Sequence, residues 1–180
     1  MKRLENKIVV VTGASTGIGQ GSAKVLANEG AHVLALDISD KLDDTVKEIN
    51  EAGGQATAYK VDISNEHQVE QFAEEAKDKY GRENIRANAI APGTIETPLV
   101  DNLAGTSEDE AVKTFRENQK WVTPLGRLGT PDEVGKLVTF LASDDSSFIT
   151  GETIRIDGGV MAYTWPGEML SDDSWKNSTK

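Results

Sequence analysis

The chain has 180 residues, enough for one compact domain and too few for two ordinary ones. Its 19 basic and 30 acidic residues give a net charge of −11 with no basic cluster, which argues against binding nucleic acid or an anionic membrane through bulk charge. The absence of Cys excludes disulfides, thiolate zinc sites and Cys nucleophiles. No apolar run approaches the ~18 residues of a membrane helix and no signal peptide is evident, so we expect a cytoplasmic protein.

The first half of the chain predicts three strand-and-helix units. Residues 7–13 form a nearly unbroken β-branched run, typical of a strand buried on both faces of a parallel sheet. A helix is expected from Ile18 to about Gly30, where glycine ends it. The next two units comprise strands over 32–37 and 56–62, a helix capped by Ser39 or Asp40 with Leu42, Val46 and Ile49 facing inward, and a helix capped by Ser64 with the apolar stripe Val69, Phe72, Ala73, Ala76 and Tyr80.

The second half continues the alternation. Its expected elements are a strand over 85–91 closed by Pro92 and Gly93, a helix over about 108–119 with Ser107 and Glu110 at capping-box spacing, an amphipathic helix opened by Thr130, Pro131 and Glu133, and a strand over 153–157. Strands that alternate with helices predict a doubly wound α/β fold with a parallel sheet and right-handed crossovers. We expect one domain over residues 1–161 and a C-terminal tail over 162–180.

A glycine-rich loop lies between the first strand and the first helix. Gly13, Gly17 and Gly19 let the backbone approach a phosphate at a helix N-terminus, where free N–H groups and the helix dipole favour an anion. Asp37 ends the second strand 18 residues after Gly19, close to the ~20-residue interval at which a carboxylate binds an adenosine ribose. A carboxylate there repels a 2′-phosphate, so NAD is favoured over NADP. The alternative is that the glycines serve only a structural turn.

The order of motifs resembles that of the short-chain dehydrogenase/reductases over residues 4 to about 160. The resemblance is carried by TGASTGIG, by DIS at 62–64, by PGTIET at 92–97, and by PLGRLGTPDEV and ITGETIRIDGG further on. It implies a Rossmann-type sheet, shortened to about five strands from the family's seven, and hydride transfer between an alcohol or carbonyl and NAD. It also implies cofactor contacts: pyrophosphate at Gly13, Ser15, Gly17, Ile18 and Gly19, ribose at Asp37, adenine at Asp62 and Ile63, and nicotinamide at Pro92, Gly93, Ile95 and Thr97.

Two of these contacts have structural explanations as well. Without the resemblance, Asp62 is equally well explained as a residue that leads into the helix after Ser64. Pro92 and Gly93 alone would be a turn that ends a strand.

The catalytic segment of the family is absent from this sequence. Between the third helix and the strand that ends in Pro-Gly, the family carries an Asn-Asn-Ala-Gly motif, a catalytic Ser and a Tyr-x-x-x-Lys motif. None of the three tyrosines, Tyr59, Tyr80 and Tyr163, has Lys four positions later. We therefore predict an in-frame deletion near residues 81–86 that removes two strand-and-helix units of ~30 residues or more each.

The deletion leaves several hypotheses about function open. The first is a family member that binds NAD but lacks competent catalytic machinery. The second is a non-catalytic, partner-dependent subunit whose uncovered sheet face associates with another copy or with a full-length relative. A third, less favoured hypothesis is an active oxidoreductase that acts on a small alcohol, carbonyl or sugar with residues rebuilt or supplied by a partner.

The deletion also leads to a prediction about geometry. The strand over 85–91 could pair beside the first strand, which would move the loop after it by about 10 Å, two strand spacings, toward Gly13. Mainly the helix that carries Val69, Phe72 and Ala76 would then cover one face of the sheet.

Overall fold

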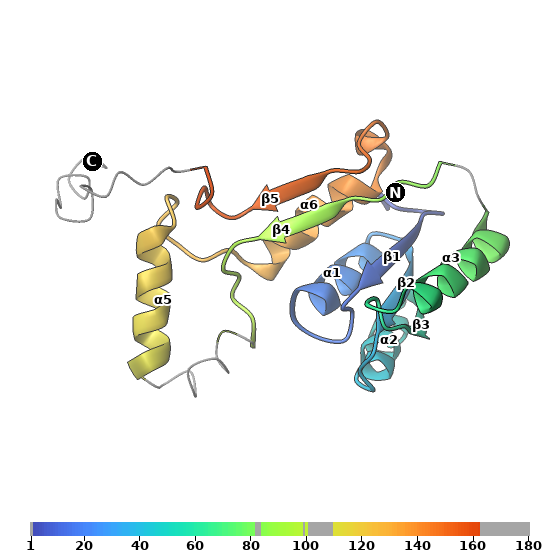
Figure 1. Cartoon of the computed structure of the whole chain (residues 1–180), viewed down its shortest axis with the longest axis horizontal. Coiled ribbons are helices and arrows are strands. Elements are labelled where there is room, and N and C mark those ends of the chain that lie inside the picture. Colours follow the sequence, from blue (N-terminus) through green and yellow to red (C-terminus); the bar gives the residue numbers. More distant parts are fainter. Residues whose placement is uncertain (1, 82–83, 99, 101–109, 163–180) are drawn as a thin grey trace.

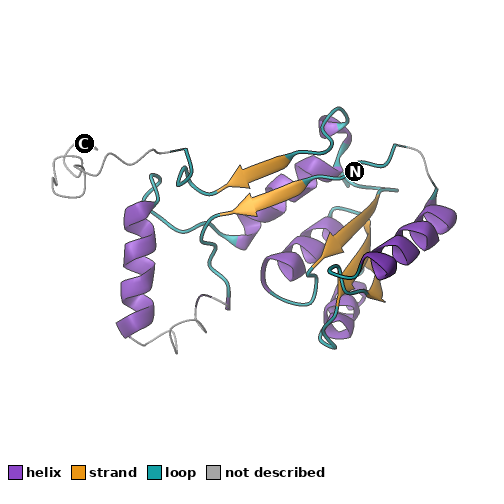
Figure 2. Cartoon of the chain, viewed as in Figure 1, coloured by secondary structure: helices purple, strands orange, loops and turns teal. Residues whose placement is uncertain are grey.

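Five parallel strands in the described part of the chain form two separate sheets (Figure 1, Figure 2). The structure is a computed structural model that describes residues 2–81, 84–98, 100 and 110–162. One sheet has the order β1-β2-β3 and the other pairs β4 with β5. The strands are β1 (Ile8–Thr12), β2 (His32–Asp37), β3 (Gln55–Lys60), β4 (Ala89–Pro92) and β5 (Thr153–Ile156). The predicted α/β fold with about five parallel strands is confirmed.

The helices occupy the positions between and after these strands. They are α1 (Gly17–Asn28), α2 (Leu42–Glu51), α3 (Glu66–Tyr80), α5 (Glu110–Val122), α6 (Pro131–Ala142) and the short 3-10 helix η1 (Asp144–Ser146). The expected residues 107–109 at the start of α5, and the expected tail from residue 163, lie outside the described residues. None of the described helices is both long enough and apolar enough to cross a membrane.

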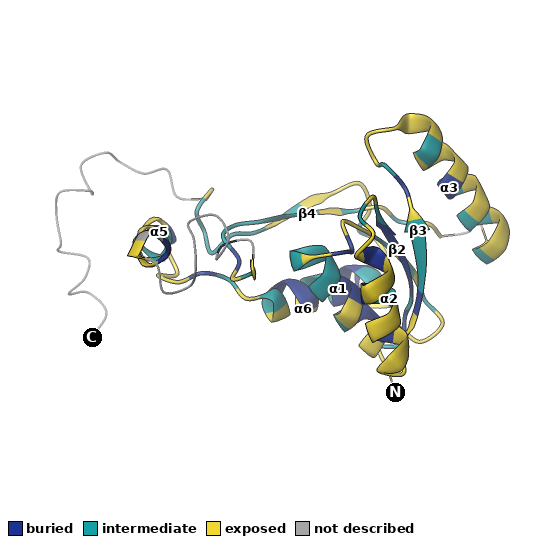
Figure 3. Ribbon diagram, turned by 90° about the horizontal axis from the view of Figure 1, so that it is seen from below, coloured by how far each residue is buried: buried dark blue, intermediate teal, exposed yellow. Residues whose placement is uncertain are grey.

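Helices α1 and α2 cover one face of the three-stranded sheet. Alternate residues of the strands point to this face, and α6 packs along the outer side of the same layer beside α1 (Figure 3). The buried residues of this core are Leu4, Ala14, Ala23, Leu26, Ala27, Ala31, Val33, Ala35, Leu42, Ile49 and Ala56, with Val9, Val11, Val46, Ala58, Val138 and Ala142 packed against them.

The opposite face is covered by α3 alone among the described elements, and only in part. Phe72 is buried against Leu34 and Leu36 of β2, whereas Val69 is 38% exposed. On β1, Ile8 is 41% and Val10 is 46% exposed, so the prediction that this strand is buried on both faces is wrong. The reason is that α3 lies over β2 and β3 and does not reach across β1. The prediction that one sheet face is thinly covered is confirmed.

The predicted pairing of the fourth strand beside the first is also wrong. β4 pairs with β5, with Ile90 opposite Ile154, and β1 pairs with β2 alone among the described strands. The expected 10 Å shift of the Pro92 loop toward Gly13 therefore has no basis. The physical reason is that α6 is anchored on α1, where a Cβ at Gly135 would lie 2.9 Å from Val25 Cγ2. This close helix contact fixes the second sheet away from the edge of β1 (Figure 1).

Polar contacts link the amino-terminal ends of the two sheets. Lys7, just before β1, forms an ion pair with Asp144 of η1, and Arg3 pairs with Asp145 at 3.3 Å. Arg86, ahead of β4, donates to the carbonyl oxygen of Ser143 at 3.1 Å. The two sheets are therefore joined through helices and loops rather than through a strand ladder.

The fourth strand begins later than predicted, at Ala89 instead of residue 85. Before it, Arg86 Nη1 and Asn88 Nδ2 both donate to the carbonyl oxygen of Ile149, at 3.1 and 3.0 Å. Gly151 N donates to the carbonyl oxygen of Ala87 at 2.7 Å, but side chains make the other hydrogen bonds of this segment, so it does not continue the strand, and Ile85 is 62% exposed.

Two of the predicted helix caps are wrong. The N-cap of α2 is Lys41, and its side chain makes no cap hydrogen bond. Ser39 does not cap the helix, because its hydroxyl accepts from the backbone N–H of Lys41, which lies before the first helical residue. Helix α3 is capped by Asn65, since Ser64 donates instead to the carboxylate of Asp62. Each residue bonds locally to its neighbours and so marks the turn ahead of the helix.

The capping box predicted for α6 is confirmed. Thr130 accepts from the N–H of Glu133, whose carboxylate accepts from the N–H of Thr130 and from both terminal nitrogens of Arg127. The Arg127 guanidinium and the Thr130 donors lower the pKa of Glu133 to about 2. This helix therefore begins at a well-fixed point, directly after the strand-like segment that contains Gly129.

Candidate functional site

The glycine loop lies between β1 and α1, as its sequence predicts. Gly13 and Gly17 have φ values of +66° and +57°, and a Cβ at either would meet nothing within 4 Å. Gly19 is different, because its Cβ would lie 2.1 Å from the carbonyl oxygen of Gly13. The first two glycines thus leave open space above the loop, and the third allows the helix to approach the loop closely.

The N-terminus of α1 has neither a side-chain cap nor an acidic residue in its first turn. Thr16, at the N-cap position, makes no cap hydrogen bond through its side chain. The first N–H groups of a helix have no partner within the helix and carry positive partial charge. In α6, by contrast, Thr130 and Glu133 fill these positions. The start of α1 can therefore accept an anion in the space beside Gly17 and Ile18.

Asp37 lies at the carboxyl end of β2, beside this loop. Its Oδ2 accepts from Ser15 Oγ at 2.6 Å and from Ser15 N at 3.1 Å, and its Oδ1 accepts from Ser39 N at 3.0 Å. Burial raises the pKa of Asp37, but the hydrogen bonds from Ser15 and Ser39 outweigh it and leave the pKa below its usual value. The carboxylate is thus ionised at neutral pH and held against the loop. Ser15, for which a pyrophosphate contact is predicted, donates its hydroxyl to Asp37.

Sequence reasoning missed Thr45 and Gln20, which support the loop from behind. Thr45 of α2 is fully buried, and its Oγ1 lies 3.3 Å from the carbonyl oxygen of Ser15. Gln20 of α1 donates to the same hydroxyl at 3.0 Å. The sequence does contain one sign of a buried polar contact here: Thr45 lies on the same face of α2 as the apolar residues Leu42 and Ile49.

The predicted adenine contacts lie after β3. Asp62 Oδ1 accepts from Ser64 N at 2.9 Å and from Ser64 Oγ at 2.7 Å, and the Ser64 hydroxyl and backbone N–H lower the pKa of the Asp62 carboxyl. The next residue, Ile63, is 60% exposed. Asp62 therefore organises the turn into α3, as its structural explanation requires, and Ile63 offers an apolar surface to solvent.

The predicted nicotinamide contacts lie at the carboxyl end of β4, in the second sheet. Gly93 donates to the carbonyl oxygen of Ile156, and a Cβ on it would lie 2.9 Å from Asp157 Cα. Ile95 is buried and bridges to Gly129, and Thr97 accepts from the N–H of Val100. One segment at the carboxyl end of β4 thus contains Pro92, Gly93, Ile95 and Thr97. The glycine loop follows β1, which is a strand of the other sheet.

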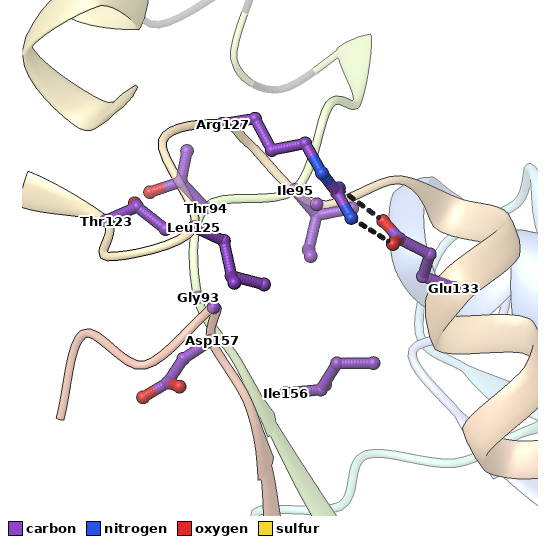
Figure 4. Close-up of a pocket in the computed structure, with 11 residues that line it drawn as sticks. Gly93, Thr94, Ile95, Thr123, Leu125, Arg127, Glu133, Ile156 and Asp157 are labelled. Atoms are coloured by element: carbon purple, nitrogen blue, oxygen red, sulfur yellow. Dashed lines mark hydrogen bonds and ion pairs between the residues drawn. The ribbon is translucent and has the colours of Figure 1, made fainter. Parts of the chain in front are cut away.

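A small cavity of about 90 Å³ adjoins this second loop (Figure 4). Leu125 and Ile156 line it, and the Arg127–Glu133 pair closes one side. Ligand pockets for small molecules are usually about 300–1,000 Å³. The cavity is therefore too small for a nicotinamide riboside, and no residue of the glycine loop lines it.

Tyr80 and His32 are placed away from these loops. Tyr80 stacks edge-on against His32 with the ring centroids 5.4 Å apart, and His32 is the first residue of β2 whereas Asp37 is the last. Burial and the nearby Lys79 lower the pKa of His32. His67 lies in the first turn of α3 and is exposed. Tyr80 and His32 thus pack at the opposite end of the sheet from the candidate site.

Comparison with known proteins agrees with this architecture. A family model described as short chain dehydrogenase matches residues 7–82, and one described as enoyl-(acyl carrier protein) reductase matches residues 78–161. An uncharacterized oxidoreductase, YxbG of Bacillus subtilis, is 38% identical over 273 aligned positions that cover 100% of both chains. The 3-oxoacyl-[acyl-carrier-protein] reductase FabG of Thermotoga maritima is 27% identical and covers 88% of this chain and 99% of its own. The chain belongs to the short-chain dehydrogenase/reductase family.

Solved structures show the same fold. The crystal structure of L-sorbose reductase from Gluconobacter frateurii matches with a TM-score of 0.76 and 18% identity, covering 91% of this chain and 100% of that chain. A short-chain type dehydrogenase/reductase from Mycobacterium marinum matches with a TM-score of 0.71 and 22% identity. The chain has the Rossmann fold of the family, truncated relative to these structures.

Proposed function

We propose that this chain binds the adenosine half of NAD and does not carry out hydride transfer by itself. The observation that carries the proposal is the joint geometry of the loop and Asp37: an uncapped helix start beside Gly17, with an ionised carboxylate at the end of the next strand. In this domain, expected to span residues 1–161, NAD would supply the hydride acceptor. The chain's own residues would bind and orient its adenosine diphosphate.

The loop fits a pyrophosphate because of the space over its glycines. Gly13 and Gly17 leave that space open. The uncapped N–H groups at the start of α1 would donate to the pyrophosphate, and the first turn has no acidic side chain that would compete for them. Ile18 and Gly19 would contribute their backbone, and Asp62 and Ile63 would border the adenine.

The charge on Asp37 supports NAD over NADP. Ser15 donates twice to Oδ2 of Asp37, whereas Oδ1 accepts from Ser39 N at 3.0 Å, so Oδ1 is the oxygen that a ribose hydroxyl would approach. A 2′-phosphate would be placed against an ionised carboxylate, which costs binding free energy. Among the cofactors of the fold, NAD is thus the better match.

The absence of a catalytic Tyr-x-x-x-Lys supports the second part of the proposal. Aligned with YxbG, the 180 residues of this chain are spread over 273 positions, so at least 93 positions have no residue here. The two family models meet at residues 78–82, where the deletion is predicted. Both findings support an internal deletion between α3 and β4. The loop of Pro92, Gly93, Ile95 and Thr97 would then lack its catalytic neighbours.

Replacing Asp37 with Ala is expected to weaken ADP-ribose binding by about 10- to 100-fold, because a hydrogen bond to a charged group contributes about 1.5–3 kcal/mol. The variant should also lose its preference for NADH over NADPH. Isothermal titration calorimetry with ADP-ribose, NADH and NADPH measures both effects. No change in absorbance at 340 nm is expected when wild-type protein is incubated with NAD and a panel of alcohols and sugars.

Asp40→Ala is the matched control for this experiment. It removes the same charge three residues later, where Asp40 is exposed and paired with Lys60. Its ADP-ribose affinity should equal that of the wild type. Undetectable ADP-ribose binding to a folded wild-type sample would refute cofactor binding, and turnover at 340 nm would refute the loss of catalysis.

The exposed residues of β1 favour a second function, that of a partner-dependent subunit. Ile8 and Val10 remain partly exposed on the face that α3 leaves uncovered, at the unpaired edge of the sheet. An edge strand without Lys or Pro on it is a template for pairing with another chain. Such a subunit would associate with another copy or with a full-length relative.

The double substitution Ile8→Thr and Val10→Thr is expected to reduce such association, because Thr keeps the β propensity of the strand and removes its apolar surface. Size-exclusion chromatography with light scattering over a range of concentrations measures the effect. Val9→Thr with Val11→Thr is the control, since those residues face the α1 side, and it should lower the melting temperature without reducing association. A wild-type protein that stays monomeric at all concentrations contradicts association with another copy.

A further inference from the structure

The hydroxyl of Thr45 connects three parts of the fold at one buried point. It lies 3.3 Å from the carbonyl oxygen of Ser15 in the glycine loop and 3.5 Å from that of Lys41 in its own turn. Gln20, in the first turns of α1, donates to it at 3.0 Å. A hydroxyl has a single hydrogen, so it donates mainly to the closer acceptor, which is Ser15. The loop, α1 and α2 therefore share one hydroxyl group.

Ser15 is held from both of its ends. Thr45 binds its carbonyl oxygen, while its backbone N–H and its hydroxyl both donate to Oδ2 of Asp37. Ser15 is itself buried, and Thr45 is completely inaccessible to solvent. Thr45 thus cannot touch a bound nucleotide, but a movement of the Ser15 peptide would change both hydrogen bonds to Asp37.

We infer that Thr45 is a positioning residue for the adenosine end of the site: it fixes the Ser15 peptide and, through it, the orientation of the Asp37 carboxylate. The inference rests on the proposed cofactor site for its functional meaning. The structural link from Thr45 through Ser15 to Asp37 exists without a nucleotide. It explains why a polar side chain occupies a fully buried position on the inward face of α2.

The test compares Thr45→Val with Thr45→Ser. Val keeps the shape of Thr and removes the hydroxyl, whereas Ser keeps the hydroxyl and removes a methyl group. Thr45→Val is expected to weaken ADP-ribose binding by about 3- to 10-fold, in line with the loss of one or two buried hydrogen bonds. Because the donors of Ser15 lower the pKa of Asp37, the same variant should raise that pKa in a carbon-13 NMR titration of the side-chain carboxyl. Thr45→Ser should restore both values toward those of the wild type.

Thr139→Val is the matched control. Thr139 is a buried Thr of α6 whose hydroxyl donates to the carbonyl oxygen of Gly135 at 2.8 Å, far along the chain from the loop. Its substitution should lower stability without changing the pKa of Asp37 or the ADP-ribose affinity.

Two outcomes overturn the inference. One is a Thr45→Val protein in which the pKa of Asp37 is that of the wild type. The other is a pair of Thr45 variants that lose affinity equally, since that would show a packing role without a role for the hydroxyl. The NMR titration needs no nucleotide, so it tests the positioning role even if wild-type protein fails to bind ADP-ribose, which would refute only the proposed function.

Discussion

Replacing Gly19 with Ala is expected to abolish ADP-ribose binding and to destabilise the fold by about 3 kcal/mol, the upper end of the cost of overpacking. The added Cβ would lie 2.1 Å from the carbonyl oxygen of Gly13 and 3.1 Å from that of Thr12. Both are backbone atoms, so no side chain can rotate to make room. Helix α1 would have to move away from the loop that its N-terminus completes. Urea denaturation and calorimetry with ADP-ribose measure the two losses.

Gly21→Ala is the control for this substitution, two residues further along the same helix. A Cβ at Gly21 would lie 3.7 Å from Pro131 Cβ, an ordinary contact. Ala has the higher helix propensity, so this variant should gain up to about 1 kcal/mol of stability and keep its ADP-ribose affinity. Equal behaviour of the two variants would contradict the close approach of α1 to the loop.

Replacing Gly135 with Leu is expected to separate α6 from α1 and to cost about 3 kcal/mol of stability. Even a Cβ at this buried position would lie 2.9 Å from Val25 Cγ2, and Val is stiff about its first side-chain torsion. Leu is a good helix former, so the loss would come from the helix interface and not from α6 itself. Urea denaturation gives the change in free energy, and hydrogen exchange shows whether the β4–β5 amides lose protection.

Lys136→Leu is the matched control, because the same residue type is introduced at the next position, where the side chain is 75% exposed. It breaks a surface ion pair with Asp132 and should change stability little. Adding Val25→Ala to the Gly135→Leu variant should recover part of the loss. A Gly135→Leu protein as stable as the wild type would show that the α1–α6 contact does not hold the sheets together.

Local signals in the sequence predicted the elements that depend on local chemistry. Thr130 and Glu133 marked the start of α6 correctly, because a capping box is a contact between neighbours in sequence. Asp37 was placed correctly at the end of its strand by the apolar residues before it. The caps at Ser39 and Ser64 were misplaced because a hydroxyl has several local partners and the sequence does not rank them.

Contacts between distant segments were the part that the sequence did not predict. The apolar run of β1 predicts burial on both faces, but the exposure of Ile8 and Val10 depends on which elements lie over the strand. The separation of β4 from β1 accompanies the packing of α6 on α1, which no motif encodes. Thr45 was missed for the same reason, since its partner Ser15 is 30 residues away.

The interruption between β1 and β4 has a consequence for how the chain unfolds. In a continuous sheet, each strand's backbone hydrogen bonds are lost together with those of its neighbours. Here the β1-β2-β3 ladder and the β4-β5 ladder share no backbone hydrogen bond among the described strands, so cooperativity between them is carried by side-chain packing. The two sheets are thus two potential cooperative units, and the smaller, with strands of four residues, is the one expected to open first.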